Sequence, residues 1–355
     1  MIPMQTHLTS RLGTLVLALT GAILFQALSL PLPFLFGPMT ACLVAALAGA
    51  PLKEIGKIST AARTILGVAI GASITPDTVS RVPQLLGSLA LIPLYVALIG
   101  LIGVPFFRRL GYDPVTSWYA AMPGGLPDMV AFGKDAGGDV RALALIHATR
   151  VLVIITLAPI IMTFVYGAHL SAPLGDPALN LPSVELALMA ASALIGWKVG
   201  ERVGLFGASI LGPMMITAAL SLGGLIHSRP PVEAIVFAQL FIGIGIGTQY
   251  VGVTIRELRS FIYSGVSFVI ILSVLAAILT EIVTVTGLAN PIEGFLAFAP
   301  GGQAEMIILG IAAGSDLGFI VVHHLARVVI VITGAPIAAR IAGVRKQNPQ
   351  ANTDA

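Results

Sequence analysis

Ionisable residues that recur at a fixed spacing inside apolar sequence are the first feature of this chain that suggests chemistry. Two sets, each of an aspartate, a histidine and an arginine, occur far apart in the chain: Asp139, His147 and Arg150, and Asp316, His324 and Arg327. At about 100° per residue along a helix, each set falls within an arc of about 80°. An ionisable side chain at the bilayer centre costs about 2.5–3.5 kcal/mol on insertion scales, so it faces protein or a water-filled cavity. Each set therefore predicts a polar helix face that binds an ion or a charged solute.

A Pro-Gly-Gly tripeptide and a carboxylate precede each set. The candidate binding residues in these segments are Gly124, Gly125 and Asp128 in the first, and Gly301, Gly302 and Glu305 in the second. A helix that starts after the glycines would present free N–H groups and a positive dipole end to an anion. The tripeptide is also compatible with a simple tight turn between packed helices.

Two roles remain open for the charged residues. In a structural role, Arg150 pairs with Asp128 or Glu305, Arg327 takes the complementary partner, and the pairs hold each glycine segment against its helix. In a functional role, the two carboxylates bind a coupling proton or Na⁺, while the arginines or the half-helix ends hold a solute. The histidines are either packed core residues or a proton relay.

An internal duplication contains these residues. Residues 123–159 and 300–336 align at an offset of 177, with 15 of 37 positions identical. Upstream, the Gly-Pro-Met segments at 37–39 and 212–214 match, as do the glycines of 67–71 and 243–247. The chain is therefore predicted to contain a first repeat, 1–178, a second repeat, 179–345, and a polar tail, 346–355.

Composition indicates the environment of both repeats. Of the 355 residues, 57% are hydrophobic and 10% charged, and the mean hydropathy is +0.98. Soluble proteins contain about 25% charged residues, so we expect an all-α polytopic membrane protein. Apolar spans occur near residues 12–30, 34–50, 62–76, 84–107 and 140–165, and again near 182–199, 204–226, 232–251, 260–288 and 317–340. The glycine-containing stretches 116–138 and 291–315 are each long enough for two half-helices.

The distribution of Lys and Arg predicts the topology. If each glycine-containing stretch enters and leaves the bilayer on one side, only Arg81 and Arg229 fall on the face opposite to thirteen basic residues: Arg11, Lys53, Lys57, Arg63, Arg108, Arg109, Lys198, Arg202, Arg256, Arg259, Arg340, Arg345 and Lys346. The positive-inside rule then favours five crossings per repeat, one re-entrant hairpin each, and both termini in the cytoplasm. An odd number of crossings inverts the second repeat, as in many secondary transporters. Six crossings per repeat, in parallel, is the alternative.

Several function classes are not indicated. The net charge of +3 includes no basic run longer than two, so no nucleic-acid partner is expected. The single cysteine, Cys42, excludes an intramolecular disulfide, and no zinc-type Cys/His spacing occurs. The metal-protease, serine-hydrolase and P-loop spacings are absent too, so we expect neither an enzyme nor a cofactor.

The duplicated Gly-Pro-Met segment, and the duplicated Pro-Gly-Gly hairpin with its Asp, His and Arg helix, resemble the AbrB-type membrane duplication family. The resemblance runs from about Leu12 to Ala342. This family has been labelled both an ammonia monooxygenase and a regulator of gene expression, and it is distinct from the soluble DNA-binding regulator of the same name. The resemblance implies a multi-pass protein of the bacterial inner membrane and specifies no substrate.

Architecture and paired residues together predict an ion-coupled secondary transporter or exporter of a small polar or anionic solute, bound at the midplane between the two hairpins. The coupling ion is H⁺ or Na⁺, and a homodimer is compatible with the small-residue helix faces. The alternative is an integral membrane regulatory protein that influences gene expression through a partner.

Overall fold

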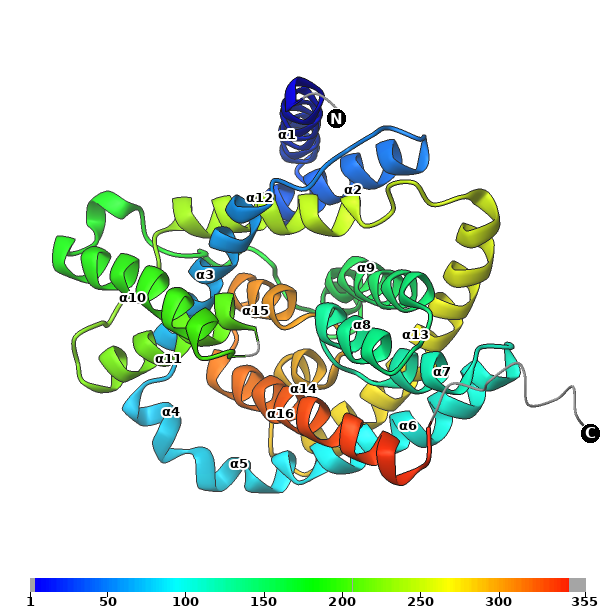
Figure 1. Cartoon of the computed structure of the whole chain (residues 1–355). Helices are drawn as coiled ribbons and strands as arrows, with labels where there is room; N and C mark the ends of the chain where they lie inside the picture. Colours follow the sequence, from blue (N-terminus) through cyan, green and yellow to red (C-terminus); the bar gives the residue numbers. More distant parts are fainter. Residues whose placement is uncertain (1–3, 206, 345–355) are drawn as a thin grey trace, which may run out of the picture. The chain divides into compact units, whose positions relative to one another are not determined.

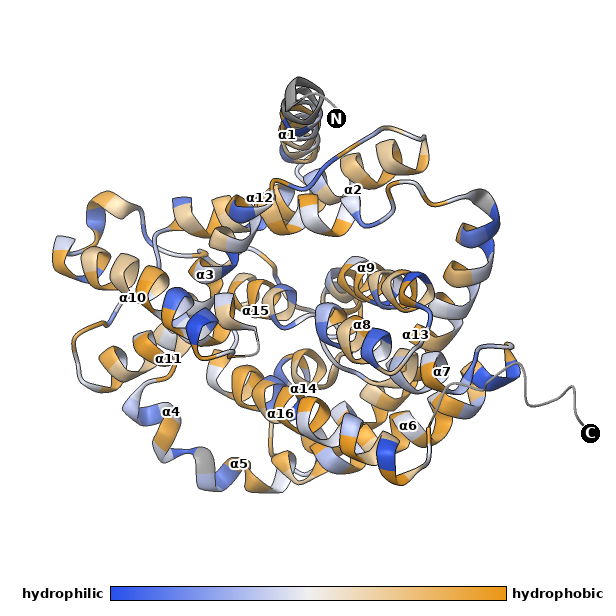
Figure 2. Ribbon diagram, viewed as in Figure 1, coloured by the Kyte–Doolittle hydropathy of each residue, from blue (hydrophilic) through white to orange (hydrophobic). Residues whose placement is uncertain are grey.

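The computed structural model describes residues 4–205 and 207–344, and this part of the chain is built from helices and turns, without a β-strand. Six helical stretches among the described residues are long and apolar enough to cross a membrane: Ser10–Ala27, Pro83–Arg109, Val140–Phe164, Ser183–Arg202, Arg256–Val285 and Leu317–Ile341. Figure 2 shows apolar residues along most helices, with hydrophilic ones gathered at helix ends such as the start of α13 (Ile255–Val285). The expected all-α polytopic membrane protein is therefore confirmed. The predicted tail, 346–355, lies outside the described residues.

Each predicted apolar span contains a helix. In the first repeat these are α1 (Met4–Ala27), α2 (Pro33–Leu47), α3 (Lys57–Ala72), α5 (Val82–Leu89) with α6 (Leu91–Arg109), and α9 (Val140–Phe164). In the second they are α10 (Ser183–Arg202), α11 (Ala208–Leu222), α12 (Val232–Thr248), α13 and α16 (Leu317–Ile341). The helices α2, α3, α11 and α12 have only 15 to 17 residues, fewer than the about 20 that a full crossing needs. Inverted orientation and re-entry of the hairpins stay predictions.

The chain divides into two compact units that do not coincide with the predicted repeats. Unit 1 comprises Met1–Pro83, Ala158–Val253 and Ala304–Val321. Unit 2 comprises Gln84–Leu157, Thr254–Gln303 and Val322–Ala355. Each unit therefore takes segments from both halves of the sequence.

Close glycine contacts hold unit 1 together, and the two halves use equivalent positions. Gly21 of α1 lies against Gly37 of α2, as Gly196 of α10 lies against Gly212 of α11. A side chain at any of these glycines would collide with the facing backbone. Small residues of this kind let two helix backbones approach closely, as is common between membrane helices.

In unit 1, helices from the first half of the sequence also pack against helices from the second half. Gly71 of α3, from the first half, faces Met214 of α11, from the second. Gly247 of α12, from the second half, faces Cys42 of α2, from the first. Figure 1 shows α3 running beside α10 and α11, and α12 beside α2. Neither half of the sequence therefore completes this packing alone.

Unit 2 contains the long helices α6, α13 and most of α9 and α16, together with the short helices α7 (Pro114–Ala121), α8 (Leu126–Asp135) and α14 (Pro291–Phe298). The side chain of Phe268 on α13 packs edge-on against Phe107 on α6, with ring centroids 4.8 Å apart. Gly103 of α6 admits the Phe268 ring and Ala121 of α7. These contacts bring α6, α7 and α13 together around the residues of the candidate site.

Candidate functional site

Two pairs of short helices occupy the predicted hairpin stretches. The first pair is α7 and α8 (Leu126–Asp135), and the second is α14 and α15 (Gln303–Ala312). Both first members begin in the same way, because the side chains of Asp113 and Asn290 accept backbone N–H groups at the helix start. A proline follows each cap at the first helical position, where its missing N–H costs nothing. The 113–114 and 290–291 pairs keep the offset of 177, so the duplication also sets where each hairpin begins.

The Pro-Gly-Gly segments break both pairs as expected. Gly125 is extended (φ −64°, ψ 143°) and directly precedes α8. The Met129 side chain lies over Gly124, so a Cβ atom there would come within 2.6 Å of the Met129 methyl group. After α8 and α15, Gly137 and Gly314 take left-handed φ values of 87° and 67°, which suit glycine at a helix C-terminus.

The two arginines bind the C-terminal ends of the first half-helices. Arg150 donates from Nη1 to the Met122 carbonyl at 3.1 Å and from Nη2 to the Gly124 carbonyl at 2.6 Å. The equivalent Arg327 donates to Ala299 at 2.8 Å and to Gly301 at 3.3 Å. The last carbonyls of a helix lack intrahelical donors and carry the negative end of its dipole. Each guanidinium therefore caps α7 or α14 and fixes the turn that follows.

The two histidines bind the same helix ends one turn earlier. Nε2 of His147 lies 3.0 Å from the Tyr119 carbonyl, and Nε2 of His324 lies 2.8 Å from the Leu296 carbonyl. Because a carbonyl only accepts, both Nε2 atoms carry the proton. Nδ1 of His324 then accepts from Nη2 of Arg327 at 3.0 Å, whereas the buried Nδ1 of His147 has no partner. The histidines thus stabilise both hairpins, and only the second joins its arginine.

Within unit 2, the expected pair of an arginine with Asp128 does not form. Within the described chain, neither Arg150 nor Arg327 makes an ion pair, because main-chain carbonyls take the donors that we assigned to Asp128 and Glu305. Asp128 lies in the first turn of α8 in unit 2 and is half-buried. Glu305 lies in the first turn of α15 in unit 1, where it is buried and feels the charge of Arg63.

The two aspartates of the sequence sets lie directly before α9 and α16 and not within these helices. Oδ1 of Asp139 accepts the backbone N–H groups of Arg141 and Ala142, at 2.9 and 3.0 Å, and so caps α9. Oδ1 of Asp316 accepts the N–H of Gly318 at 2.9 Å, and its Oδ2 pairs with Arg81 at 2.9 Å. These contacts give both aspartates a structural role at a helix start.

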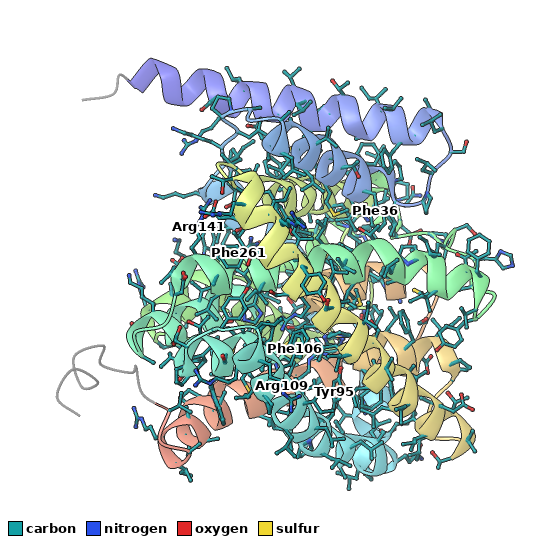
Figure 3. All side chains as sticks on the ribbon, turned by 90° about the vertical axis from the view of Figure 1, so that its right-hand side faces the viewer. Phe36, Tyr95, Phe106, Arg109, Arg141 and Phe261 are labelled. Atoms are coloured by element: carbon teal, nitrogen blue, oxygen red, sulfur yellow. The ribbon has the colours of Figure 1, made fainter. Side chains whose placement is uncertain are left out.

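Tyr95 is a residue of the site that sequence reasoning missed. It comes from α6, together with Phe106 and Arg109 (Figure 3), and its side chain is fully buried in unit 2. The hydroxyl donates to the Phe298 carbonyl at 2.8 Å and interacts electrostatically with both Arg150 and Arg327. A tyrosine inside an apolar span has no duplicate here, since the offsets of 176 and 177 on either side of it place Ile271 or Leu272 opposite it. No sequence signal therefore marked it.

The result is a buried cationic cluster, defined by Arg150, Arg327 and Tyr95. The two arginines are only 4% and 3% exposed, and the Nε atom of each has no hydrogen-bond partner. Buried charges without a partner are costly, which makes this cluster a place where an anion would be favoured. Among the described residues, no group of three or more His, Cys, Asp or Glu side chains could hold a metal ion.

Comparison with known proteins agrees with these features. The family described as "Transition state regulatory protein AbrB" matches residues 34–343 of the chain. A protein of Escherichia coli strain K12 described as "Putative regulator AbrB" is 27% identical over 335 residues, covering 92% of this chain and 94% of that protein. "Uncharacterized protein YhjN" of Bacillus subtilis strain 168 is 24% identical over 299 residues, covering 77% of this chain and 75% of that protein. The chain therefore belongs to the AbrB family of helical membrane proteins.

Proposed function

We propose that this protein is a secondary transporter that moves a small polar or anionic solute across the bacterial inner membrane, driven by an H⁺ or Na⁺ gradient. The observation that supports it best is the pair of hairpins whose turns are held by buried arginines, in equivalent positions of the two halves. Irregular backbone at membrane depth is tolerated where protein buries it or a water-filled cavity reaches it. A structure that only spans the membrane needs no such interruption.

In this proposal the hairpin turns at Gly124-Gly125 and Gly301-Gly302 line the solute site. The arginines position these turns through the carbonyls of residues 122, 124, 299 and 301. Asp128 and Glu305 carry the coupling ion, since each is a carboxylate in the first turn of a second half-helix and forms no ion pair among the described residues. The proposal assigns no catalytic step to the chain, and it places both termini in the cytoplasm.

The test is solute uptake by the purified full chain in proteoliposomes. A panel of metabolites is offered under an imposed pH gradient, an imposed Na⁺ gradient, or neither. We expect one solute class to accumulate under one of the gradients. Counterflow of the same solute, with no gradient, separates binding and translocation from coupling.

Variants separate the roles of the carboxylates. Asp128→Asn with Glu305→Gln should abolish accumulation under a gradient but leave counterflow measurable, because the solute site keeps its arginines. Asp135→Asn is the matched control, since Asp135 is the exposed last residue of the same helix α8. Full accumulation by the double variant would contradict the coupling role of the two carboxylates. Absence of any solute movement by the unmodified chain would contradict transport itself.

A regulatory function is the second candidate, and the descriptions of the family and of the Escherichia coli relative favour it. In this case the chain would change gene expression through a partner without moving a solute. Transcript profiles of cells that lack the protein, and of cells that carry the Asp128→Asn and Glu305→Gln variant, discriminate the two. A profile that is restored in full by a variant unable to accumulate solute supports direct regulation.

A further inference from the structure

The cationic cluster of unit 2 has an unbalanced charge. Arg150 and Arg327 bring two guanidinium groups into the same buried region, where Tyr95 interacts electrostatically with both. Neither forms an ion pair within the described chain, and each interacts instead with neutral carbonyl groups. The positive charge of the cluster must therefore be balanced by helix dipoles or by a bound anion.

The dipoles offset only a part of this charge. Each guanidinium caps the C-terminal end of one half-helix, which is equivalent to roughly −0.5 elementary charge. Two such ends leave a residual charge of about +1 in a region that excludes water. One bound monoanion would neutralise it, whereas a neutral or cationic solute would leave it or increase it.

The cluster also keeps hydrogen-bond donors that the hairpins do not use. A guanidinium has five N–H groups, and the carbonyls and His324 take only the Nη donors here. The Nε atoms of Arg150 and Arg327 are buried and have no partner. A buried donor without an acceptor costs about 1–3 kcal/mol, so an anionic acceptor would remove this cost at both arginines.

We propose that the solute is a small monoanion, held by the Nε–H groups of Arg150 and Arg327 beside the hydroxyl of Tyr95. This assignment rests on the proposed function and narrows its solute class. Tyr95 donates its proton to the Phe298 carbonyl, so its oxygen keeps only lone pairs, which repel the charged end of an anion and accept from a hydroxyl group. The two sides of the site are therefore unequal. Since an apolar residue, Ile271 or Leu272, lies opposite Tyr95 in the second half, this inequality would orient a solute that has one charged end.

The direct test is ligand-induced thermal stabilisation of the purified full chain in detergent, at constant ionic strength set with the bulky anion gluconate. The probes are acetate and lactate as monoanions, succinate as a dianion, acetamide as a neutral isostere and methylammonium as a cation. We expect a melting-temperature increase of about 2 °C or more with a monoanion, a smaller one with succinate, and none with the other two. Equal shifts for acetamide and acetate, or no shift for either monoanion, would overturn the proposal.

Variants locate the site. Arg327→Gln should weaken monoanion binding about tenfold or more, because it removes a charge-assisted bond, and Arg327→Lys should weaken it less. Tyr95→Phe should bind acetate as tightly as the unmodified chain or more tightly, because it removes a lone pair beside the anion. It should lower the preference for lactate over acetate, because the lactate hydroxyl loses an acceptor. Arg109→Gln is the control for total charge, since Arg109 is exposed at the end of α6, and it should bind as the unmodified chain does.

A variant that does not fold is recognised by the lack of a melting transition. If Arg327→Gln does not fold, Arg327→Lys, which keeps the charge, tests whether Arg327 binds the monoanion. Unchanged monoanion binding by Arg327→Lys, together with an unchanged preference between lactate and acetate in Tyr95→Phe, would place the anion elsewhere. The experiments distinguish a failure of the transporter proposal from a failure of the monoanion proposal. A chain that binds acetate or lactate but moves no solute contradicts the transporter, whereas one that accumulates only neutral solutes contradicts the monoanion.

Discussion

The close packing of α3 against α11 in unit 1 predicts how much a substitution at Gly71 destabilises the protein. A methyl group at this position would lie 2.5 Å from the Met214 carbonyl oxygen and 2.7 Å from Cβ of Thr217, both on α11. Ordinary contact of this kind begins at 3.4 Å, so the α11 backbone would have to retreat by about 0.9 Å. Overpacking in a tight interior costs about 1–3 kcal/mol, and a backbone contact belongs at the upper end of that range. Alanine itself favours a helix over glycine by about 1 kcal/mol.

The matched control is Gly334→Ala on α16. Gly334 is also inside a helix, but a methyl group there meets no atom within 4 Å. Only the helix preference acts at this position, so the variant should be as stable as the unmodified chain or up to about 1 kcal/mol more stable. We therefore expect Gly71→Ala to be less stable than Gly334→Ala by about 2–3 kcal/mol.

The assay is thermal or denaturant unfolding of both purified variants in the same detergent, followed by loss of helical circular dichroism. Gly247→Ala provides an internal check, because its methyl group would lie 2.6 Å from Cβ of Cys42 and 2.7 Å from the Met39 carbonyl oxygen. It should be destabilised to a similar degree. If Gly71→Ala and Gly247→Ala both unfold like Gly334→Ala, the close approach of α3 to α11 and of α12 to α2 is wrong.

Three further predictions concern topology and polar contacts. Single cysteines in place of Arg109 and Asp176, both exposed, should react with a membrane-impermeant thiol reagent from opposite faces of the membrane; labelling from one face contradicts five crossings per repeat. Asp139→Ala should destabilise the protein by about 1 kcal/mol in the same unfolding assay, since it removes the cap of α9, whereas Asp139→Asn should keep most of the stability. The Arg81–Asp316 pair is partly exposed, so a double-mutant cycle with alanine at both positions should give a coupling of about 0.2–1 kcal/mol, smaller at high salt.

The sequence predicted the helices well because a long apolar run has few other solutions in a membrane. Every predicted span contains a helix, and both Pro-Gly-Gly segments separate two short helices. The backbone conformation is also the same in the two halves at some positions where the residue types differ. Ser29 and Leu32 adopt left-handed φ values of 53° and 46°, as do Gly204 and Gly207 at the equivalent positions. A left-handed serine or leucine has no sequence signature, so this turn could not be predicted in the first half.

The site was predicted less completely, for a physical reason. Sequence separation identifies which charged residues recur, but not whether a buried arginine binds a carboxylate or a helix end. Arg150 and Arg327 chose carbonyls because the last turns of α7 and α14 lack internal donors. Tyr95 was not predicted as a site residue because it is not duplicated. Asp139 was assigned to a helix face, although it lies just before the first residue of α9.

These differences between the halves bear on how a duplicated site could recognise an asymmetric solute. The repeated residues Arg150 and Arg327 contribute equal charges to the cluster, which attract an anion but do not orient it. The orientation must come from positions at which the halves differ. Tyr95 has an apolar counterpart, Ile271 or Leu272, and His324 accepts from Arg327 where His147 leaves Nδ1 without a partner. Replacing the non-duplicated groups should therefore change which anion binds, whereas replacing the arginines should decide whether any anion binds.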